Sequence, residues 1–391
     1  MAPTFHGPQR VLMTADPIGG VWTYALELAD GLGRAGVATV LATMGRELAP
    51  AQRARAEAVP GLVLEESRLK LEWMPDAGDA VARAGDWLLG LERRHAPDLV
   101  HVNGYAHAAL PWRAPCIAVA HSCVWSWWRA VKGGPLPPEW YGYARRVAEG
   151  LHAAQLVVAP TAAFLDTIQT LYGALPRARV IHNGRSAAAF RPAAVKEEIV
   201  FSAGRVWDEA KNVGALDAVA ADLGWPVIVA GDWQPPDGRG EPPANALCLS
   251  TLDPDQIAAW LARAAVFALP ARYEPFGLAA LEAGLSGCAL VLGDIPTLRE
   301  LWEDAAVFVP PDDHAALREA LRELVRSPSR RAELGRAARA RALELGAERM
   351  ARGYLQAYAD VLSRRPAVAG RVAAPLAAAA LPPIISQVIA G

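Results

Sequence analysis

The sequence predicts an α/β protein with two doubly wound parallel sheets, and three observations lead to this class. The chain has 391 residues, a length that favours two domains of about 150–200 residues over one. Short apolar, β-branched runs alternate with longer stretches of helical periodicity, and this alternation occurs twice. The break between the two halves falls at "FRPAAVKEE", residues 190–198, where Pro192 and a cluster of charges interrupt the pattern.

The expected strands are the apolar runs themselves. In the first half they cover residues 10–15, 38–43, 99–103, 116–121, 156–161 and 179–184. In the second half they cover residues 198–205, 226–232, 246–250, 266–271, 289–294 and 306–311. Because most of these runs are continuously apolar rather than alternating, we expect parallel strands that are buried on both faces.

The composition indicates a globular protein and excludes several classes. Hydrophobic residues make up 53% of the chain, charged residues 20%, and the net charge is −2. A dedicated nucleic-acid binder normally has a basic excess, so no nucleic-acid partner is expected. The four cysteines form no CxxC pair, so the sequence predicts neither a zinc site nor a disulfide framework. With an apolar run too short for a signal peptide at the N-terminus, these features predict a cytoplasmic protein.

The C-terminal segment from residue 372 to 391 carries no charge and is long enough to span a bilayer. However, Pro375, Pro382 and Pro383 would break a helix there, and alanine is only weakly apolar. We therefore expect residues 366–391 to form a packed or disordered Ala/Pro-rich tail, with weak peripheral membrane association as the alternative.

Polar and glycine residues follow the expected strands, where ligands bind in doubly wound sheets. They are Gly19, Gly20, His121, Asn183, Gly204 and Arg205. The glycine pair precedes a helix whose first amides can face an anion or a sugar. It does not form GxGxxG, which removes the main support for a nicotinamide-dependent enzyme. Both halves are thus expected to direct polar groups at one cleft.

The stretch "RYEPFGLAALEAG" places Glu274 and Glu282 eight residues apart. The proline and glycine between them suit a loop that turns into a helix, and Leu278, Leu281 and Leu285 give that helix a buried stripe. A phosphate can bind at the helix N-terminus, and Glu282 lies roughly 7–8 Å further along the axis. A nucleoside diphosphate sugar fits this spacing, with its ribose at Glu282 and its sugar hydroxyls at Glu274. The alternative is that the two glutamates are a loop charge and a solvated helix charge.

A diphosphate leaving group also needs positive charge, and Arg205 and Lys211 can supply it. The alternative is an ordinary basic surface loop. Lysine and asparagine are rare here, with four of each, so Lys211 and the adjacent Asn212 persist against the compositional bias.

These residues carry a resemblance to a known family. The chain resembles the retaining glycosyltransferases of family 4, which have the GT-B architecture, over about residues 9–365. The matching stretches are residues 19–29, 101–104, 120–122, 157–161, 180–184, 202–212 and 274–284. The most specific is the Glu-x7-Glu stretch with Pro-Phe-Gly inside it. The family often has Asn-Gly-Val-Asp after the strand at 179–181, whereas this chain has "HNGRSAAAF".

The resemblance implies a role for each matching residue. Arg205 and Lys211 would hold the donor diphosphate, Glu274 the donor sugar, and Glu282 the ribose, while His121 would lie against the donor sugar. The remaining donor-binding residues that it implies are Pro275, Phe276, Gly277 and Leu278, through their backbone.

Two further motifs are better explained by structure. Asp253-Pro254-Asp255 matches a metal-binding DxD, but it precedes a helix and therefore predicts an N-cap, so no metal and no other cofactor is expected. The aromatic residues that follow His121 are expected to be divided between core and acceptor side. His101 and His182 are expected to be core histidines.

The sequence thus predicts a GT-B glycosyltransferase with an acceptor domain at 1–190, a nucleotide-sugar domain at 191–345 and a crossover helix at 346–365. It would transfer a hexosyl group, with retention, from a nucleotide diphosphate sugar to a hydroxyl acceptor. The alternatives are a GT-B epimerase or phosphorylase and a degenerate, non-catalytic sugar-nucleotide binder.

Overall fold

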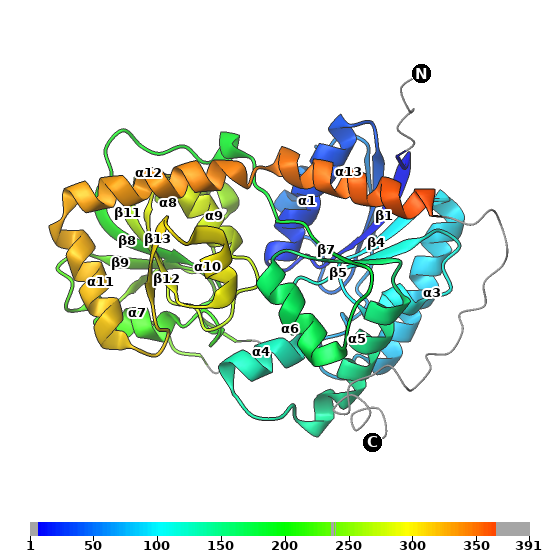
Figure 1. Cartoon of the computed structure of the whole chain (residues 1–391), viewed down its shortest axis with the longest axis horizontal. Coiled ribbons are helices and arrows are strands. Elements are labelled where there is room, and N and C mark those ends of the chain that lie inside the picture. The colour runs from blue at the N-terminus through cyan, green and yellow to red at the C-terminus, as the bar shows by residue number, and fades with distance from the viewer. Residues whose placement is uncertain (1–6, 236–237, 239, 365–391) are drawn as a thin grey trace. The chain divides into compact units, whose positions relative to one another are not determined.

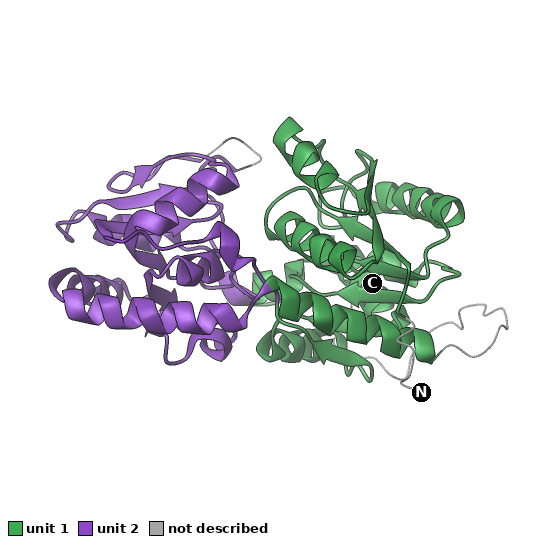
Figure 2. Cartoon of the chain, turned by 90° about the horizontal axis from the view of Figure 1, so that it is seen from above, with its two compact units in different colours: residues 1–129, 134–182, 347–391 green, residues 130–133, 183–346 purple. Residues whose placement is uncertain are grey.

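The computed structural model describes residues 7–235, 238 and 240–364 (Figure 1). The chain divides into two compact units, which Figure 2 colours separately. Within the described residues, unit 1 comprises 7–129, 134–182 and 347–364, and unit 2 comprises 130–133 and the rest of 183–346. The predicted tail at 366–391 lies outside the described residues.

Unit 1 is built on a seven-stranded parallel sheet with the order β3-β2-β1-β4-β5-β6-β7. Its strands are β1 Arg10–Ala15, β2 Ala38–Thr43, β3 Leu62–Glu66, β4 Leu99–Val102, β5 Cys116–Val119, β6 Leu156–Ala159 and β7 Ala178–Val180. Its helices are α1 Gly20–Arg34, α2 Pro50–Glu57, α3 Gly78–His95, α4 Val124–Val131, α5 Tyr141–Ala153, α6 Ala162–Tyr172 and α13 Ala347–Ser363, with short 3₁₀ turns at Ala106–Ala109 and Pro138–Trp140. The order reverses direction between β1 and β4, so the sheet is doubly wound.

Unit 2 repeats this plan with a six-stranded parallel sheet in the order β10-β9-β8-β11-β12-β13. Its strands are β8 Glu197–Ala203, β9 Val227–Ala230, β10 Leu247–Cys248, β11 Ala264–Leu269, β12 Ala289–Gly293 and β13 Ala306–Val309. Its helices are α7 Val213–Ala220, α8 Pro254–Arg263, α9 Leu278–Leu285, α10 Pro296–Trp302, α11 His314–Arg326 and α12 Pro328–Glu344, with a 3₁₀ turn at Ala187–Ala189.

The continuously apolar strands of unit 2 are buried on both faces, as the sequence predicts. In β8, Phe201 packs into the cluster beneath α8, α9 and α12, whereas the preceding Val200 packs into the cluster beneath α7 and α11. In β12, Leu290 likewise packs into the first of these clusters and Val291 into the second. Side chains alternate across a strand, so a strand covered by helices on both faces must be apolar at every position.

Each predicted strand segment contains a strand, but the structure adds β3, which the sequence analysis does not predict. β3 lies at the edge of its sheet and reads "LVLEE", with Val63 47% exposed. An edge strand is covered less completely and tolerates charge, so the apolar signal that identifies the central strands is weak there.

The division between the units falls at residues 182/183, earlier than the sequence-based break at 190–198. The segment that begins at Asn183 belongs to unit 2 because it packs on that unit's core, where Phe190 is 2% exposed. Helix α13 returns the chain to unit 1 and packs closely on α1, since a Cβ at Gly31 would lie 2.6 Å from Ala351 Cβ.

All four cysteines are free thiols in the structure. Within the described part of the chain, none of the helices combines the length and apolar character that a membrane crossing requires.

Candidate functional site

The candidate residues of unit 2 follow β8 and β11, the two strands between which the sheet order reverses. Arg205 comes two residues after the end of β8, and Glu274 comes five residues after the end of β11. Both strands are parallel, so both loops leave from the same edge of the sheet. This edge at the reversal point is the usual ligand position in doubly wound folds.

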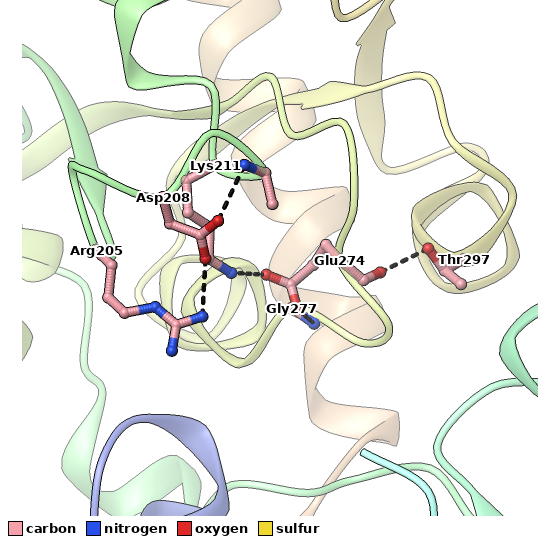
Figure 3. Close-up of polar contacts among 7 residues, drawn as sticks. Arg205, Asp208, Lys211, Glu274, Gly277 and Thr297 are labelled. Atoms are coloured by element: carbon pink, nitrogen blue, oxygen red, sulfur yellow. Dashed lines mark hydrogen bonds and ion pairs between the residues drawn. The ribbon is translucent and has the colours of Figure 1, made fainter. Parts of the chain in front are cut away.

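The loop after β8 holds Arg205 against an acidic neighbour. Arg205 Nη2 donates to Asp208 Oδ2 at 2.8 Å. Its guanidinium carbon lies over the Trp207 ring, 5.4 Å from the ring centroid, which is within the range of a cation–π contact. The Asp208 side chain is 5% exposed. Its carboxylate accepts from Arg205, and its backbone carbonyl accepts from the Lys211 amide at 2.8 Å (Figure 3). Burial alone would raise the pKa of Asp208, but the charges of Arg205 and Lys211 outweigh it and hold the pKa below its ordinary value. Asp208 therefore stays ionised beside the two cations.

The loop after β11 holds Glu274 in a set of three contacts (Figure 3). Lys211 Nζ forms an ion pair with Glu274 Oε2, and the Gly277 amide donates to Oε1 at 3.0 Å. Thr297 Oγ1 of α10 donates to the Glu274 carbonyl oxygen at 2.6 Å. The side chains of Lys211 and Glu274 are only 19% and 13% exposed, so the interpretation of Glu274 as a simple loop charge is wrong.

These contacts correct one element of the predicted phosphate site. A phosphate is expected at the N-terminus of α9, whereas the Gly277 amide there donates to Glu274 Oε1. Gly277 has φ +90°, and a Cβ there would lie 3.2 Å from Leu298 Cδ2, so both its conformation and its packing favour glycine. Pro275 and Phe276 are buried and Leu278 is partly buried, which leaves them backbone rather than side-chain roles.

Asn212, next to Lys211, is a structural residue. Its Nδ2 donates to the carbonyl oxygens of Pro270 at 2.9 Å and Pro311 at 2.7 Å, which ties the Lys211 loop to the ends of β11 and β13. Its φ of +55° lies in the left-handed region that asparagine tolerates better than most residues. On the other side of Lys211, Gly204 has φ +154°, and a Cβ there would contact the Lys211 stem at 3.6 Å.

Glu282 lies on α9 and forms an ion pair with Arg185 Nε at 2.8 Å. The two side chains are 14% and 11% exposed, so the interpretation of Glu282 as a solvated helix charge is also wrong. The Arg185 guanidinium also stacks on Phe190 at 5.1 Å, and its amide donates to the Leu345 carbonyl at 3.2 Å. Two residues depart from the family's Asn-Gly-Val-Asp pattern, Arg185 and Ser186, and the first of them is the partner of the second glutamate.

Two other predicted residues have clear places in unit 2. Asn183 is 5% exposed, and its Oδ1 has no hydrogen-bond partner among the described residues. Asp253 caps α8, as the sequence predicts, by accepting from the amides of Asp255 at 2.9 Å and Gln256 at 2.8 Å. In the described part of the chain, no group of three histidine, cysteine or acidic residues is arranged to hold a metal ion.

The candidate residues of unit 1 lie at the reversal point of its own sheet. Gly19 and Gly20 are exposed at the start of α1, and Gly19 has φ +77°. His121 follows β5, is partly buried, and its Nε2 lies 2.9 Å from Asn103 Oδ1. Asn103 follows β4 and is held to Thr14 of β1, across the point where the strand order reverses.

His101 is a core histidine, as the sequence predicts, and it is 0% exposed. Burial lowers its pKa to about 3, although the contact with Asn103 acts in the opposite direction. Burial, reinforced by His101, also lowers the pKa of His121 to about 3. Both imidazoles are therefore neutral near pH 7.

The aromatic residues after His121 differ in burial, and the acceptor-side role of the less buried ones stays a prediction. Trp125 is 7% exposed and packs edge-on against Tyr172 at 5.4 Å, whereas Trp127 and Trp128 are partly buried, 6.4 Å apart.

The comparisons with known proteins agree with this geometry. Residues 18–188 match the family model described as Glycosyltransferase Family 4, and residues 188–341 match the model described as Glycosyl transferases group 1. The glycogen synthase of Mycobacterium tuberculosis is 30% identical over 300 residues, which cover 69% of this chain and 71% of that relative. The chain belongs to glycosyltransferase family 4.

Other similar proteins are consistent with this membership. A D-inositol 3-phosphate glycosyltransferase of Xylanimonas cellulosilytica is 27% identical over 394 residues, which cover 89% of this glycosyltransferase and 93% of the relative. The structure of sucrose-phosphate synthase from Thermosynechococcus elongatus matches with a TM-score of 0.77 at 18% identity, over 91% of this chain and 100% of that chain. HepE of Anabaena in complex with UDP-glucose matches with a TM-score of 0.69 at 17% identity, over 90% and 99%. The fold of the glycosyltransferase is GT-B, with two Rossmann-like domains in one chain.

Sequence reasoning missed several residues that hold the candidate residues in place: Arg185, Asp208, Thr297 and Asn103. Asn103 and Asp208 carried a signal because they lie in the matching stretches 101–104 and 202–212, and asparagine is also rare in this chain. Arginine is abundant in this sequence, so the composition does not single out Arg185 as a candidate.

Proposed function

We propose that this glycosyltransferase transfers a hexosyl group from a nucleoside diphosphate sugar to a hydroxyl acceptor, with retention at the anomeric carbon. The observation that carries the proposal is the pairing of Lys211 with Glu274 beside Arg205, at the edge of the sheet where its strand order reverses. A cation and a carboxylate at this edge match the two ends of such a donor, its diphosphate and its sugar.

The donor diphosphate would bind by replacing the two carboxylates that pair with Arg205 and Lys211. In the structure Asp208 neutralises Arg205, and Glu274 neutralises Lys211. Arg205 is 45% exposed, so its guanidinium can turn toward a phosphate without leaving a buried site. When the phosphates engage Lys211, the Glu274 carboxylate is released to accept hydrogen bonds from the donor sugar. Asp208 and Glu274 would thus neutralise the charges of Arg205 and Lys211 until the donor binds.

Glu282 would bind the ribose hydroxyls of the donor. Its ion pair with Arg185 fixes the direction of the carboxylate on α9. A carboxylate has about four acceptor positions, so the ion pair with Arg185 is compatible with ribose binding. Arg185 would then act as the residue that orients Glu282.

The chemistry would be carried by the leaving group. Arg205 and Lys211 stabilise the charge that develops on the diphosphate as the glycosidic bond breaks. The acceptor hydroxyl attacks the same face of the sugar and transfers its proton to a departing phosphate oxygen, which explains retention without a protein nucleophile. We also propose that His121 takes part in turnover as a neutral imidazole.

We propose that no divalent metal is needed, because fixed cations supply the charge that a metal would otherwise contribute. Asp253, the first carboxylate of the DxD, is engaged at the start of α8. Turnover in excess EDTA should stay within about twofold of the untreated rate, which is under 0.5 kcal/mol of barrier. Loss of turnover that magnesium or manganese restores would contradict this part of the proposal.

The experiment that tests the function is a donor screen. The purified full-length chain is heated with UDP, GDP and ADP sugars, beginning with UDP-glucose because HepE, a structural neighbour, is solved with it. A true donor at 100 times its Kd should raise the free energy of unfolding by about 2.7 kcal/mol. Donors that stabilise the protein are then incubated with sugar and polyol acceptors, and the anomeric configuration of the product is read by NMR. An inverted product would overturn the retaining mechanism, and binding without transfer to any acceptor would favour the non-catalytic alternative.

A further inference from the structure

A chain of hydrogen bonds in unit 1 connects helix α13 to His121. Tyr358 of α13 places its hydroxyl 2.7 Å from His101 Nδ1. His101 Nε2 lies 3.1 Å from Asn103 Oδ1, and the same oxygen lies 2.9 Å from His121 Nε2. His101 and Tyr358 are both 0% exposed, whereas Asn103 and His121 are partly buried, so the end at α13 is removed from water.

The direction of every bond in this chain follows from one backbone group. Asn103 Nδ2 lies 2.8 Å from the carbonyl oxygen of Thr14, which can only accept a hydrogen bond. The amide nitrogen of Asn103 is therefore on the Thr14 side, and its oxygen faces the two histidines. The backbone N–H of Asn103 donates to Thr14 Oγ1 at 2.9 Å, so the backbone of Asn103 is also held to Thr14.

An amide oxygen can only accept, so both histidines must present an N–H to it. This makes His101 and His121 the Nε2–H tautomer, with a lone pair on Nδ1. The Nδ1 lone pair of His101 accepts a hydrogen bond from the Tyr358 hydroxyl. Every hydrogen bond from Tyr358 to His121 therefore has one donor and one acceptor. Tyr24 stacks edge-on against His121 at 4.5 Å and so limits rotation of its ring.

We propose that Asn103 is a positioning residue that holds His121 as the Nε2–H tautomer, and that the Tyr358–His101 pair fixes Asn103 in turn. His121 then offers Nδ1 as a hydrogen-bond acceptor to a hydroxyl group of the donor sugar. This last step rests on the proposed function, whereas the tautomer assignment does not. Helix α13 is thereby part of the catalytic apparatus as well as of the core.

The structure provides a matched control on the same helix. Tyr354 lies one turn before Tyr358, is equally buried, and its ring centroid is 5.3 Å from that of His101. Its hydroxyl lies beside that of Tyr24 and is bonded to none of His101, Asn103 and His121. Tyr354→Phe therefore removes a buried hydroxyl from the same place without removing a link of the chain.

The first measurement reads the tautomers directly. The full chain is labelled with ¹⁵N-histidine, and long-range ¹H–¹⁵N spectra distinguish a ring nitrogen that carries hydrogen from one that carries a lone pair. We expect Nε2–H at both His101 and His121 in the wild type and in Tyr354→Phe. In Asn103→Leu, His121 should become a mixture of tautomers. In Tyr358→Phe, His101 should keep hydrogen on Nε2, held by Asn103 Oδ1, while its Nδ1 loses the hydrogen bond from Tyr358. A wild-type His121 with hydrogen on Nδ1 would overturn the proposal, as would an Nε2–H state that persists in Asn103→Leu.

The second measurement follows turnover. Asn103→Leu should lower kcat by about 10²-fold, the scale of a misplaced catalytic group, and leave the donor KM within about twofold. Tyr358→Phe should lower kcat by about tenfold, the scale of one hydrogen bond, and Tyr354→Phe by less than twofold. Unchanged kcat in a folded Asn103→Leu protein would refute the positioning role, and Tyr358→Phe decides the matter if Asn103→Leu does not fold. If no donor supports turnover, the proposed function fails, while the tautomer spectra still decide whether this hydrogen-bond chain exists.

Discussion

The two candidate groups of this glycosyltransferase occupy equivalent places in similar sheets but are built from opposite chemistry. In unit 2 the group consists of ion pairs, Arg205 with Asp208 and Lys211 with Glu274, and it retains some exposure to water. In unit 1 the group consists of neutral residues joined by hydrogen bonds, the buried His101 and the partly buried Asn103 and His121.

The difference shows how each group can respond to a ligand. A partly exposed ion pair contributes little net stability, so its members can exchange partners when a phosphate arrives. A buried hydrogen bond is costly to leave unmade, so the neutral group keeps one geometry. We therefore expect substitutions in unit 2 to change binding and leaving-group departure, and substitutions in unit 1 to change orientation and the response of stability to pH.

The largest expected effect comes from removing a cation of unit 2. Arg205→Ala or Lys211→Ala should each lower kcat/KM for the donor by about 10²-fold or more, because each removes a charge that stabilises the departing diphosphate. Arg263→Ala is the control, since Arg263 is also exposed and bonded to a carboxylate, Glu197 at 2.6 Å, and should have little effect. Steady-state kinetics with the donor varied measures all three. Near-normal turnover in Lys211→Ala would place the diphosphate elsewhere.

The two glutamates of unit 2 should differ in the ligand that they affect. Glu274→Ala should weaken donor binding by about tenfold to 10²-fold, the scale of hydrogen bonds to a charged group, while leaving the free nucleoside diphosphate within about twofold. Glu282→Ala should weaken both ligands, because its proposed partner, the ribose, is common to them. Arg185→Ala should resemble Glu282→Ala. Isothermal titration with donor and free diphosphate gives these ratios, and equal losses on both ligands for both glutamate variants would contradict the assignment of sugar and ribose.

The buried group of unit 1 should make stability depend on pH. The pKa of His101 is lowered to about 3 from an ordinary value near 6.5, so between these values the unfolded chain binds more protons. The free energy of unfolding must then fall as the pH falls, and His101 alone accounts for about 2 kcal/mol between pH 7 and pH 5. Urea titrations across this range measure the slope, and His101→Asn should reduce it, with His121, whose pKa is also lowered to about 3, contributing to the remainder. An equal slope in wild type and variant would show that His101 does not resist protonation.

The smallest expected effect tests whether a phosphate replaces Asp208 as the partner of Arg205. Asp208→Asn keeps an oxygen for the Ala210 amide, which donates to Asp208 Oδ1 at 3.0 Å, but removes the charge that competes with a phosphate. The free nucleoside diphosphate should therefore bind about threefold to tenfold more tightly, about 0.7–1.4 kcal/mol. Tighter binding that disappears at high salt would agree with the electrostatic cause. Weaker binding would show that Asp208 orients Arg205 instead of competing for it.

The sequence by itself determined the repeated parallel sheets, because strands that are covered on both faces must be apolar throughout. It also determined the buried stripe of α9 and the cap at Asp253, because both depend on residues within one or two helical turns. The edge strand β3 was not predicted, since partial exposure allows it two glutamates and removes the apolar signal.

Only the tertiary structure decided the partners of the candidate residues. Lys211 and Glu274 are 63 residues apart in the chain, and His101 and Tyr358 are 257 apart. Sequence pattern indicates which face of an element a residue occupies, but it carries no information on which distant loop will meet it. The sequence thus predicted which residues follow the strands at each reversal point, and the packing of the sheets decided that the charged ones are paired and the neutral ones are locked in a single tautomer.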